Sequence, residues 1–218
     1  VKNLSLGYEG KAVVENLSFI VNKGDYLCIV GENGSGKTTI IRLITGLIFA
    51  QSGRFELFGI PHDSAEIRSA RRKVGAVVES PSIYQNMSAY DNLKTQSIIL
   101  GIDDNEKILS VLNDVGLGDL YKEKKHAGNF SLGMRQRLGI AMALLGDPEF
   151  LILDEPTAGL DPRERLRLRQ YIADLAENRI VFLTTHIVSD IESIATDVLL
   201  MKDGADMNLM LALVYLLI

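Results

Sequence analysis

Apolar and polar residues alternate in the first part of the chain. The alternation covers residues 1–8 and 13–25, with a glycine-containing break between them, and predicts two short antiparallel strands. Later runs are continuously apolar over the length of a strand, which is typical of strands buried on both faces of a parallel sheet. These runs are residues 26–30, 150–154 and 179–185, and two further strands are predicted over 54–61 and 73–79.

Other runs carry apolar residues at the three- and four-residue spacing of a helix. They cover residues 38–47, 88–100, 104–117, 131–145 and 162–178. Strands and helices alternate at both ends of the chain, an order that favours a parallel α/β core. The middle differs, because no convincing strand lies between residues 81 and 146. We therefore predict one domain, with a core formed by 1–80 and 147–204 and a helical subdomain inserted at 81–146.

Composition agrees with a folded domain. The chain has 218 residues, 47% of them hydrophobic, which is enough to bury a substantial core. A formal net charge of -5 argues against non-specific binding to nucleic-acid phosphates, so no nucleic-acid partner is expected. Cys28 is the single cysteine and lies in an apolar run, so we expect it to be buried; disulfides are excluded, which fits a reducing compartment. No secretion signal opens the sequence, so secretion is not expected.

The end of the chain, residues 205–218, is unusually apolar. It is too short to cross a bilayer as a helix, which takes roughly 20 residues. A buried terminal element, a segment foreign to the protein and a truncated segment all stay open as interpretations.

A glycine-rich loop separates the predicted strand 26–30 from the predicted helix 38–47. Its sequence, GENGSGKT, fits the pattern G-x-x-x-x-G-K-[ST], which binds nucleotide phosphates. The glycines let backbone N–H groups close around phosphate oxygens, the Lys37 ammonium adds a positive charge, and the Thr38 hydroxyl can bind Mg²⁺. ATP and Mg²⁺ are therefore the expected ligands. The expected nucleotide contacts are Gly31, Glu32, Asn33, Gly34, Ser35, Gly36, Lys37, Thr38 and Thr39.

Candidate catalytic residues stand at the ends of two later apolar runs, where open α/β sheets place their ligands. We expect Asp154 to hold Mg²⁺ and its waters. Glu155 is expected to deprotonate the water that attacks the γ-phosphate, a role that contributes about 10²–10⁴-fold to the rate. His186 is expected to reach the γ-phosphate from the same edge, and Lys37 completes the catalytic set. Purely structural roles stay open for both residues: Glu155 could cap the next turn, and His186 could be a structural histidine with its hydrogen bonds satisfied.

Taken in order, these motifs resemble those of the ATP-binding cassette (ABC) family, the ATPase subunits of membrane transporters. The resemblance runs from Tyr8 to about Gly204. Its parts are GENGSGKT as Walker A, FLILDE as Walker B, AGLD at 158–161 as the D-loop and His186 as the switch histidine. It implies a P-loop NTPase (RecA-like) core with an N-terminal antiparallel β layer and the inserted helical subdomain. It also implies that Tyr8 stacks on adenine and that two ATPase subunits sandwich the nucleotide.

Two stretches depart from the usual family pattern. In NFSLGMRQR, residues 129–137, Ser131 and Gly133 fit the signature motif L-S-G-G-Q, and by resemblance they contact the γ-phosphate. The departures there are Phe130, Leu132 and Met134 in place of Leu, Gly and Gln. Glu79 stands where most members have the Q-loop glutamine, and it is expected to meet Mg²⁺ or its bound water. A glutamate there is similar to cassettes of the bacitracin and lantibiotic resistance type, which implies export of a peptide antibiotic.

The sequence thus predicts an Mg²⁺-dependent ATPase that powers transport through a separate permease. By resemblance the permease docks on the helical subdomain near Glu79, and the chain lies peripherally on the cytoplasmic side of the membrane. The second ATPase subunit is either an identical chain or a related one. Two other classes stay open. One is a soluble cassette ATPase of DNA repair, ribosome association or iron–sulfur assembly. The other is a P-loop small-molecule kinase, which should lack both the signature motif and a glutamate after the Walker B aspartate.

Overall fold

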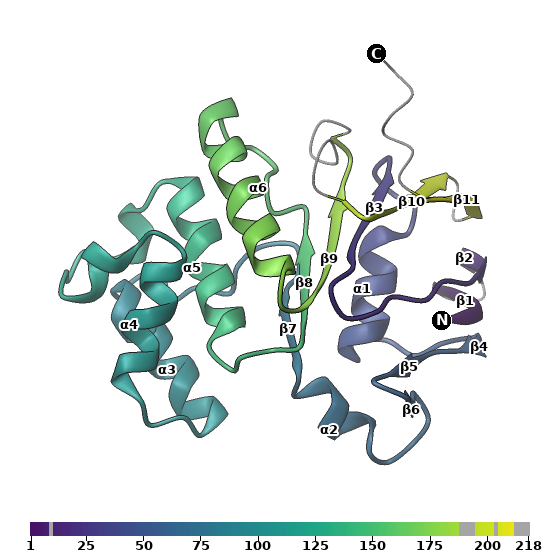
Figure 1. Ribbon diagram of the computed structural model, residues 1–218, viewed down its shortest axis with the longest axis horizontal. Helices are drawn as coiled ribbons and strands as arrows, with labels where there is room; N and C mark the ends of the chain where they lie inside the picture. Colours follow the sequence, from purple (N-terminus) through teal and green to yellow (C-terminus); the bar gives the residue numbers. More distant parts are fainter. Residues whose placement is uncertain (9–10, 188–194, 203–204, 212–218) are drawn as a thin grey trace.

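The computed structural model describes residues 1–8, 11–187, 195–202 and 205–211 (Figure 1). For Tyr8, Lys11, Lys202 and residues 205–211 it describes the backbone alone. Within these ranges nine strands form one sheet, in the order β4-β1-β2-β11-β10-β3-β9-β8-β7. The strands of this sheet are β1 (Lys2–Tyr8), β2 (Lys11–Leu17), β3 (Tyr26–Gly31), β4 (Ser52–Arg54), β7 (Val74–Val77), β8 (Phe150–Asp154), β9 (Ile180–Thr185), β10 (Asp197–Lys202) and β11 (Ala205–Leu211).

The centre of the sheet is parallel, because β10, β3, β9, β8 and β7 all run in the same direction. Side chains along β3 alternate between two hydrophobic cores: Cys28 lies in one core, and Leu27 and Ile29 lie in the other, around α1 (Lys37–Thr45). Burial on both faces accounts for the continuous apolar runs in the sequence. The carboxyl ends of β3, β8 and β9 therefore meet at one edge.

Helices cover both faces of this parallel sheet (Figure 1). Helix α1 packs in a core that it shares with the parallel strands and with the antiparallel strands β1 and β2 of the same sheet. The other face and the region beyond β7 hold the helical group and α6. The helical group consists of α3 (Ala89–Leu100), α4 (Asn105–Asp114), η1 (Gly118–Tyr121), η2 (Ala127–Asn129) and α5 (Leu132–Leu144), and α6 spans Pro162–Ala176. In the ranges described, no helix has the length and apolarity needed to cross a membrane.

Residues 54–61 do not form the single strand that the sequence pattern predicts; that prediction is wrong. Strand β4 ends at Arg54, and a separate small hairpin follows, made of β5 (Glu56–Leu57) and β6 (Ile60–Pro61). The two residues between these strands, Phe58 and Gly59, both have positive φ, 53° and 78°. A tight reverse turn needs such angles, and phenylalanine is an unusual residue to adopt them, so the sequence gives little warning of the turn.

Other boundaries also differ from the sequence pattern. The strand predicted over 13–25 ends at Leu17, and the short helix α2 (Ile67–Arg71) and strand β10 were not predicted. Part of the apolar C-terminal segment forms β11, whose backbone pairs with β10 and, at Ala205, with β2. The terminal segment thus begins as a strand of the main sheet, and residues 212–218 lie outside the described ranges.

Candidate functional site

The glycine-rich loop joins the end of β3 to the start of α1, as the sequence pattern indicates. Gly31 ends the strand where the chain is tightly packed: a Cβ there would lie 2.5 Å from both the Met201 carbonyl oxygen and Ser35 Oγ. Gly34 and Gly36 have φ of 86° and 101°, in the left-handed region that favours glycine. The glycines are therefore required by the shape of the loop itself.

Lys37 is only 4% exposed and lies across this loop. Its Nζ donates to the Gly31 carbonyl oxygen at 2.7 Å and to the Glu32 carbonyl oxygen at 3.0 Å. The Ser35 backbone N–H also donates to the Glu32 oxygen, at 3.2 Å. An incoming phosphate would therefore compete with carbonyl groups of the loop for these donors, and it has the advantage of a full negative charge. The Ser35 hydroxyl is turned inward, and among the described residues it has no hydrogen-bond partner.

Asp154 ends β8 and is 3% exposed. It accepts hydrogen bonds from Thr38 Oγ1 at 3.0 Å, from Thr184 Oγ1 at 2.5 Å and from the Glu79 backbone N–H at 3.3 Å. The Asp154 carboxylate and the Thr38 hydroxyl are hard oxygen donors of the kind that Mg²⁺ prefers. The described ranges hold no cluster of three or more metal-ligating side chains. Two protein ligands leave most of an octahedral shell to phosphate and water oxygens, so these residues fit a nucleotide-bound Mg²⁺.

Glu155 lies between a cation and an imidazole. Its carboxylate oxygens are 3.5 Å from Lys37 Nζ and 2.8 Å from His186 Nδ1. Its backbone has φ of 46°, an angle that non-glycine residues rarely adopt, and its N–H donates to both the carbonyl oxygen and the hydroxyl of Thr184 at 3.1 Å. The side chain is 26% exposed, so water can reach it. This arrangement brings a candidate base, an imidazole and the P-loop lysine into one cluster.

Glu79 lies just after β7 and has a different partner. Its carboxylate forms an ion pair with Arg42 of α1, while only its backbone N–H contacts Asp154. The sequence motifs did not reveal Arg42 or Thr184. Arg42 follows Thr38 by one helical turn, and Thr184 precedes His186 by two residues of an extended chain, so each shares a face with a predicted site residue. This spacing from a predicted site residue could have identified Arg42 and Thr184 from the sequence.

The signature residues lie apart from this cluster. Ser131 is the N-cap of α5, where its hydroxyl accepts from the Met134 N–H at 3.2 Å. A Cβ on Gly133 would lie 2.8 Å from Glu164 Oε2. Figure 1 shows β8 and β9 between α5 and α1, so the helix that begins in the signature and the helix that follows the P-loop pack on opposite faces of the sheet. The backbone of Tyr8 ends β1, but its side chain lies outside the described part of the chain.

Comparison with known proteins gives consistent matches. A family model described as "ABC transporter" matches residues 14–158. The lantibiotic transport ATP-binding protein SrtF of Streptococcus pyogenes is 39% identical over 196 residues, covering 89% of this chain and 82% of that protein. The bacitracin transport ATP-binding protein BcrA of Bacillus licheniformis is 42% identical over 204 residues, covering 93% of this chain and 66% of that protein.

Solved structures share the fold. One is cbiO1 from Clostridium perfringens, part of the ABC transporter complex cbiONQ, with a TM-score of 0.87 at 24% identity, covering 97% of this chain and 87% of that one. Another is the dimeric ATP-binding cassette MJ0796 bound to ADP and Pi, with a TM-score of 0.84 at 24% identity, covering 96% of both chains.

Proposed function

Since this chain belongs to the ABC transporter family as an ATP-binding, ATP-hydrolysing subunit, we propose that it powers the export of a peptide antibiotic through a separate permease. Two observations support this choice of substrate. The relatives described above are named for lantibiotic and bacitracin transport. A glutamate, Glu79, also occupies the position of the usual Q-loop glutamine. The chain would act on the cytoplasmic face of the membrane, paired with a second ATPase subunit.

The contacts of Glu155 carry the catalytic part of the proposal. Its carboxylate would accept a proton from the water that attacks the γ-phosphate, while His186 holds the carboxylate in place through the 2.8 Å contact. Lys37 would leave the loop carbonyls and bind the phosphates. Thr38 and Asp154 would hold Mg²⁺, which supplies charge neutralisation on the β- and γ-phosphates. The adenine would stack on Tyr8, and the partner's Ser131 and Gly133 would close the site.

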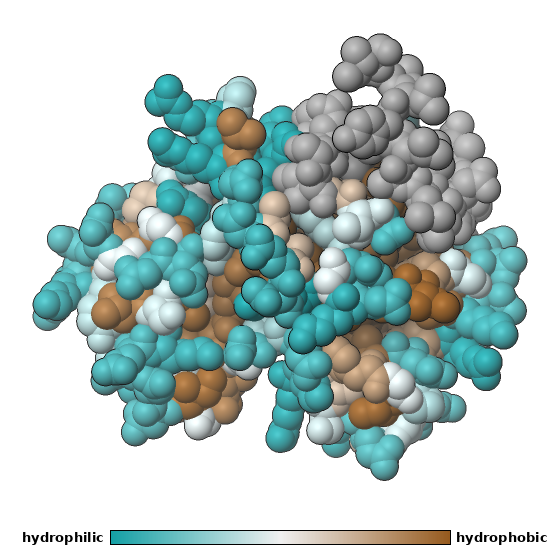
Figure 2. All heavy atoms as spheres, in the orientation of Figure 1, coloured by the Kyte–Doolittle hydropathy of each residue, from teal (hydrophilic) through white to brown (hydrophobic). Residues whose placement is uncertain are grey.

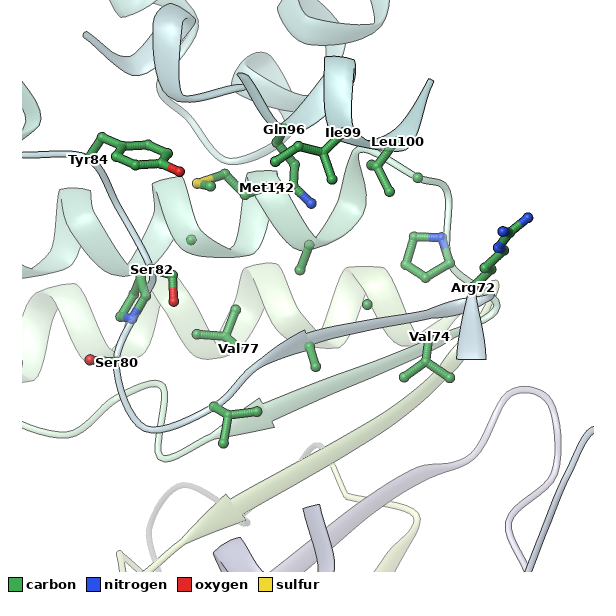
Figure 3. A pocket seen from close by; sticks show the side chains of 18 residues that line it. Arg72, Val74, Val77, Ser80, Ser82, Tyr84, Gln96, Ile99, Leu100 and Met142 are labelled. Atoms are coloured by element: carbon green, nitrogen blue, oxygen red, sulfur yellow. The ribbon is translucent and has the colours of Figure 1, made fainter. Parts of the chain in front are cut away.

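A groove beside β7 fits a docking site for the permease (Figure 3). Its volume is about 330 Å³, and it lies between β7, α3 and α5, with Tyr84, Ile99 and Met142 in its lining. Residues Ile98–Leu100 at the end of α3 are exposed although all three are apolar. Figure 2 shows hydrophobic side chains on the surface of the helical group. An apolar partner element could therefore bury this surface within reach of Glu79.

Glu155→Gln tests the proposed chemistry. The amide keeps the size of the side chain but cannot take up a proton, so we expect ATP binding to persist while hydrolysis falls by roughly 10²–10⁴-fold. Glu149→Gln is the matched control, because Glu149 precedes β8 at the opposite end, where it pairs with Lys73 at 2.8 Å on the surface. Purified ATPase activity and resistance of cells to lantibiotics or bacitracin should both fall in the first variant alone. Unchanged hydrolysis in Glu155→Gln would refute the assignment of the base, and unchanged resistance would refute the substrate.

A further inference from the structure

Arg42 is placed to control where the Glu79 carboxylate points. It lies on α1 four residues after Thr38, so both side chains project from the same face of the helix. Its guanidinium forms the ion pair with Glu79, in which the two side chains are 38% and 57% exposed. Thr38, one turn earlier, donates to Asp154 and is one of the two residues that fit Mg²⁺. The ion pair and the candidate metal site are therefore neighbours along one helix.

The backbone of Glu79 is already anchored beside that metal site. Its N–H donates to Asp154 Oδ2 at 3.3 Å, and its φ of 61° lies in the left-handed region. Because the backbone is held there, rotation of the Glu79 side chain would be enough to turn the carboxylate from Arg42 towards Asp154 and Thr38. A Mg²⁺ held by Thr38 and Asp154 would then be a second cation for this carboxylate, besides the guanidinium of Arg42.

We propose that Arg42 is a positioning residue that holds the Glu79 carboxylate away from the metal site, and that nucleotide-bound Mg²⁺ competes with Arg42 for it. The proposal rests on the ATPase function proposed above. A half-exposed ion pair is weak in water, so a divalent cation can displace it. A glutamine at position 79 could hydrogen-bond to Arg42 but would bring no charge to either cation. The competition therefore requires the glutamate found in this chain.

Binding of a fluorescent ATP analogue, measured against Mg²⁺ concentration, tests this competition without turnover. All variants carry Glu155→Gln, so the nucleotide is not hydrolysed. Arg42→Gln removes the competing cation and should lower the Mg²⁺ concentration for half-maximal binding by about two- to fivefold, the range expected for an exposed pair. Arg42→Lys, which keeps the charge, should restore most of the wild-type requirement. In a Glu79→Gln background, Arg42→Gln should produce no shift.

Each outcome decides the matter. An equal shift with and without Glu79 would show that Arg42 acts only through its general positive charge, and the proposal would be overturned. The same holds if Arg42→Gln leaves the Mg²⁺ requirement unchanged or raises it. Thermal unfolding of the nucleotide-free variants checks that each one folds. If the Glu155→Gln parent itself shows no Mg²⁺-dependent nucleotide binding, the proposed ATPase site fails as well, so the two failures are distinguishable.

Discussion

Thr184 illustrates how one hydroxyl orders two neighbouring carboxylates. It is fully buried, donates to Asp154 Oδ1 at 2.5 Å and accepts from the Glu155 N–H at 3.1 Å. Thr184→Val keeps the shape of the side chain but leaves Asp154 short of a donor. We expect the free energy of unfolding to fall by about 1–3 kcal/mol, together with a loss of ATPase activity, because buried acceptors are costly to leave unpaired.

Urea unfolding and steady-state hydrolysis measure the two effects. Thr184→Ser serves as the control, since it keeps the hydroxyl and should retain most of the activity. If Thr184→Val were as stable and as active as the wild type, the hydroxyl would have no part in positioning Asp154.

The sequence predicts some site residues better than others for a physical reason. The P-loop lysine and the pair Asp154–Glu155 follow from a motif and its place after an apolar strand, which the chain order alone reveals. Thr184 and Arg42 matter through their partners, and those partners lie 30 and 37 positions away in the sequence. Only the parallel pairing of β8 with β9, and the return of the chain after β7, bring them together.

At the scale of elements, helix α5 packs tightly against the loop that carries Glu79. A Cβ on Gly139 would lie 2.5 Å from the Cβ of Pro81. Helix propensity alone would favour alanine over glycine by about 1 kcal/mol. The overlap with a rigid proline ring should outweigh this gain, so we expect Gly139→Ala to lower the free energy of unfolding by about 1–3 kcal/mol.

Gly146→Ala is the matched control, because its added Cβ would meet only Leu100 at an ordinary 3.6 Å. Its free energy of unfolding should stay within about 0.5 kcal/mol of the wild type. Denaturant curves for both variants make the comparison. A stabilising effect of Gly139→Ala would show that Pro81 moves freely and that α5 does not constrain the Glu79 loop.

The elements that the sequence predicts well are those whose pattern is set by burial. Strands β3, β8 and β9 are apolar along most of their length because both of their faces are covered. The β5–β6 hairpin was missed because its turn depends on the backbone angles of Phe58, which no hydrophobic pattern reports. Strand β11 pairs with β10, which directly precedes it, and with β2; the sequence left this segment open because a short apolar run does not by itself distinguish a strand from another buried element.

At the scale of the whole molecule, α5, which begins in the signature, and α1, which follows the P-loop, pack on opposite faces of the sheet (Figure 1). We therefore predict that a phosphoryl-transfer site that uses both is formed by two chains, each supplying one half. Such an arrangement is testable by mixing two inactive variants. The choice of the signature variant matters, because a larger residue at Gly133 would have to displace the Glu164 carboxylate, which pairs with Arg137 and Arg167.

Ser131→Asp avoids this problem. Aspartate is as good an N-cap as serine, so α5 keeps its start, but the added charge repels a γ-phosphate. Ser131→Asn is the matched control, with the cap kept and no charge added. Lys37→Ala disables the P-loop and leaves the signature intact. Each of these two inactive variants should show little ATPase activity alone, whereas Ser131→Asn, which loses the hydroxyl but adds no charge, should retain clearly more activity than Ser131→Asp.

Mixing Lys37→Ala with Ser131→Asp should restore ATPase activity if the contact is made between chains. About half of the dimers would then be mixed, and each would hold one intact site, formed by the P-loop of the Ser131→Asp chain and the signature of the Lys37→Ala chain. Independent sites would give about a quarter of the wild-type activity. If the contact were made within one chain, every site would stay broken. A mixed dimer that is demonstrated by differential tagging but stays inactive would leave two explanations: the contact is made within one chain, or the two sites must act together. Single-site turnover, measured in a tethered dimer with one wild-type half, would decide between them.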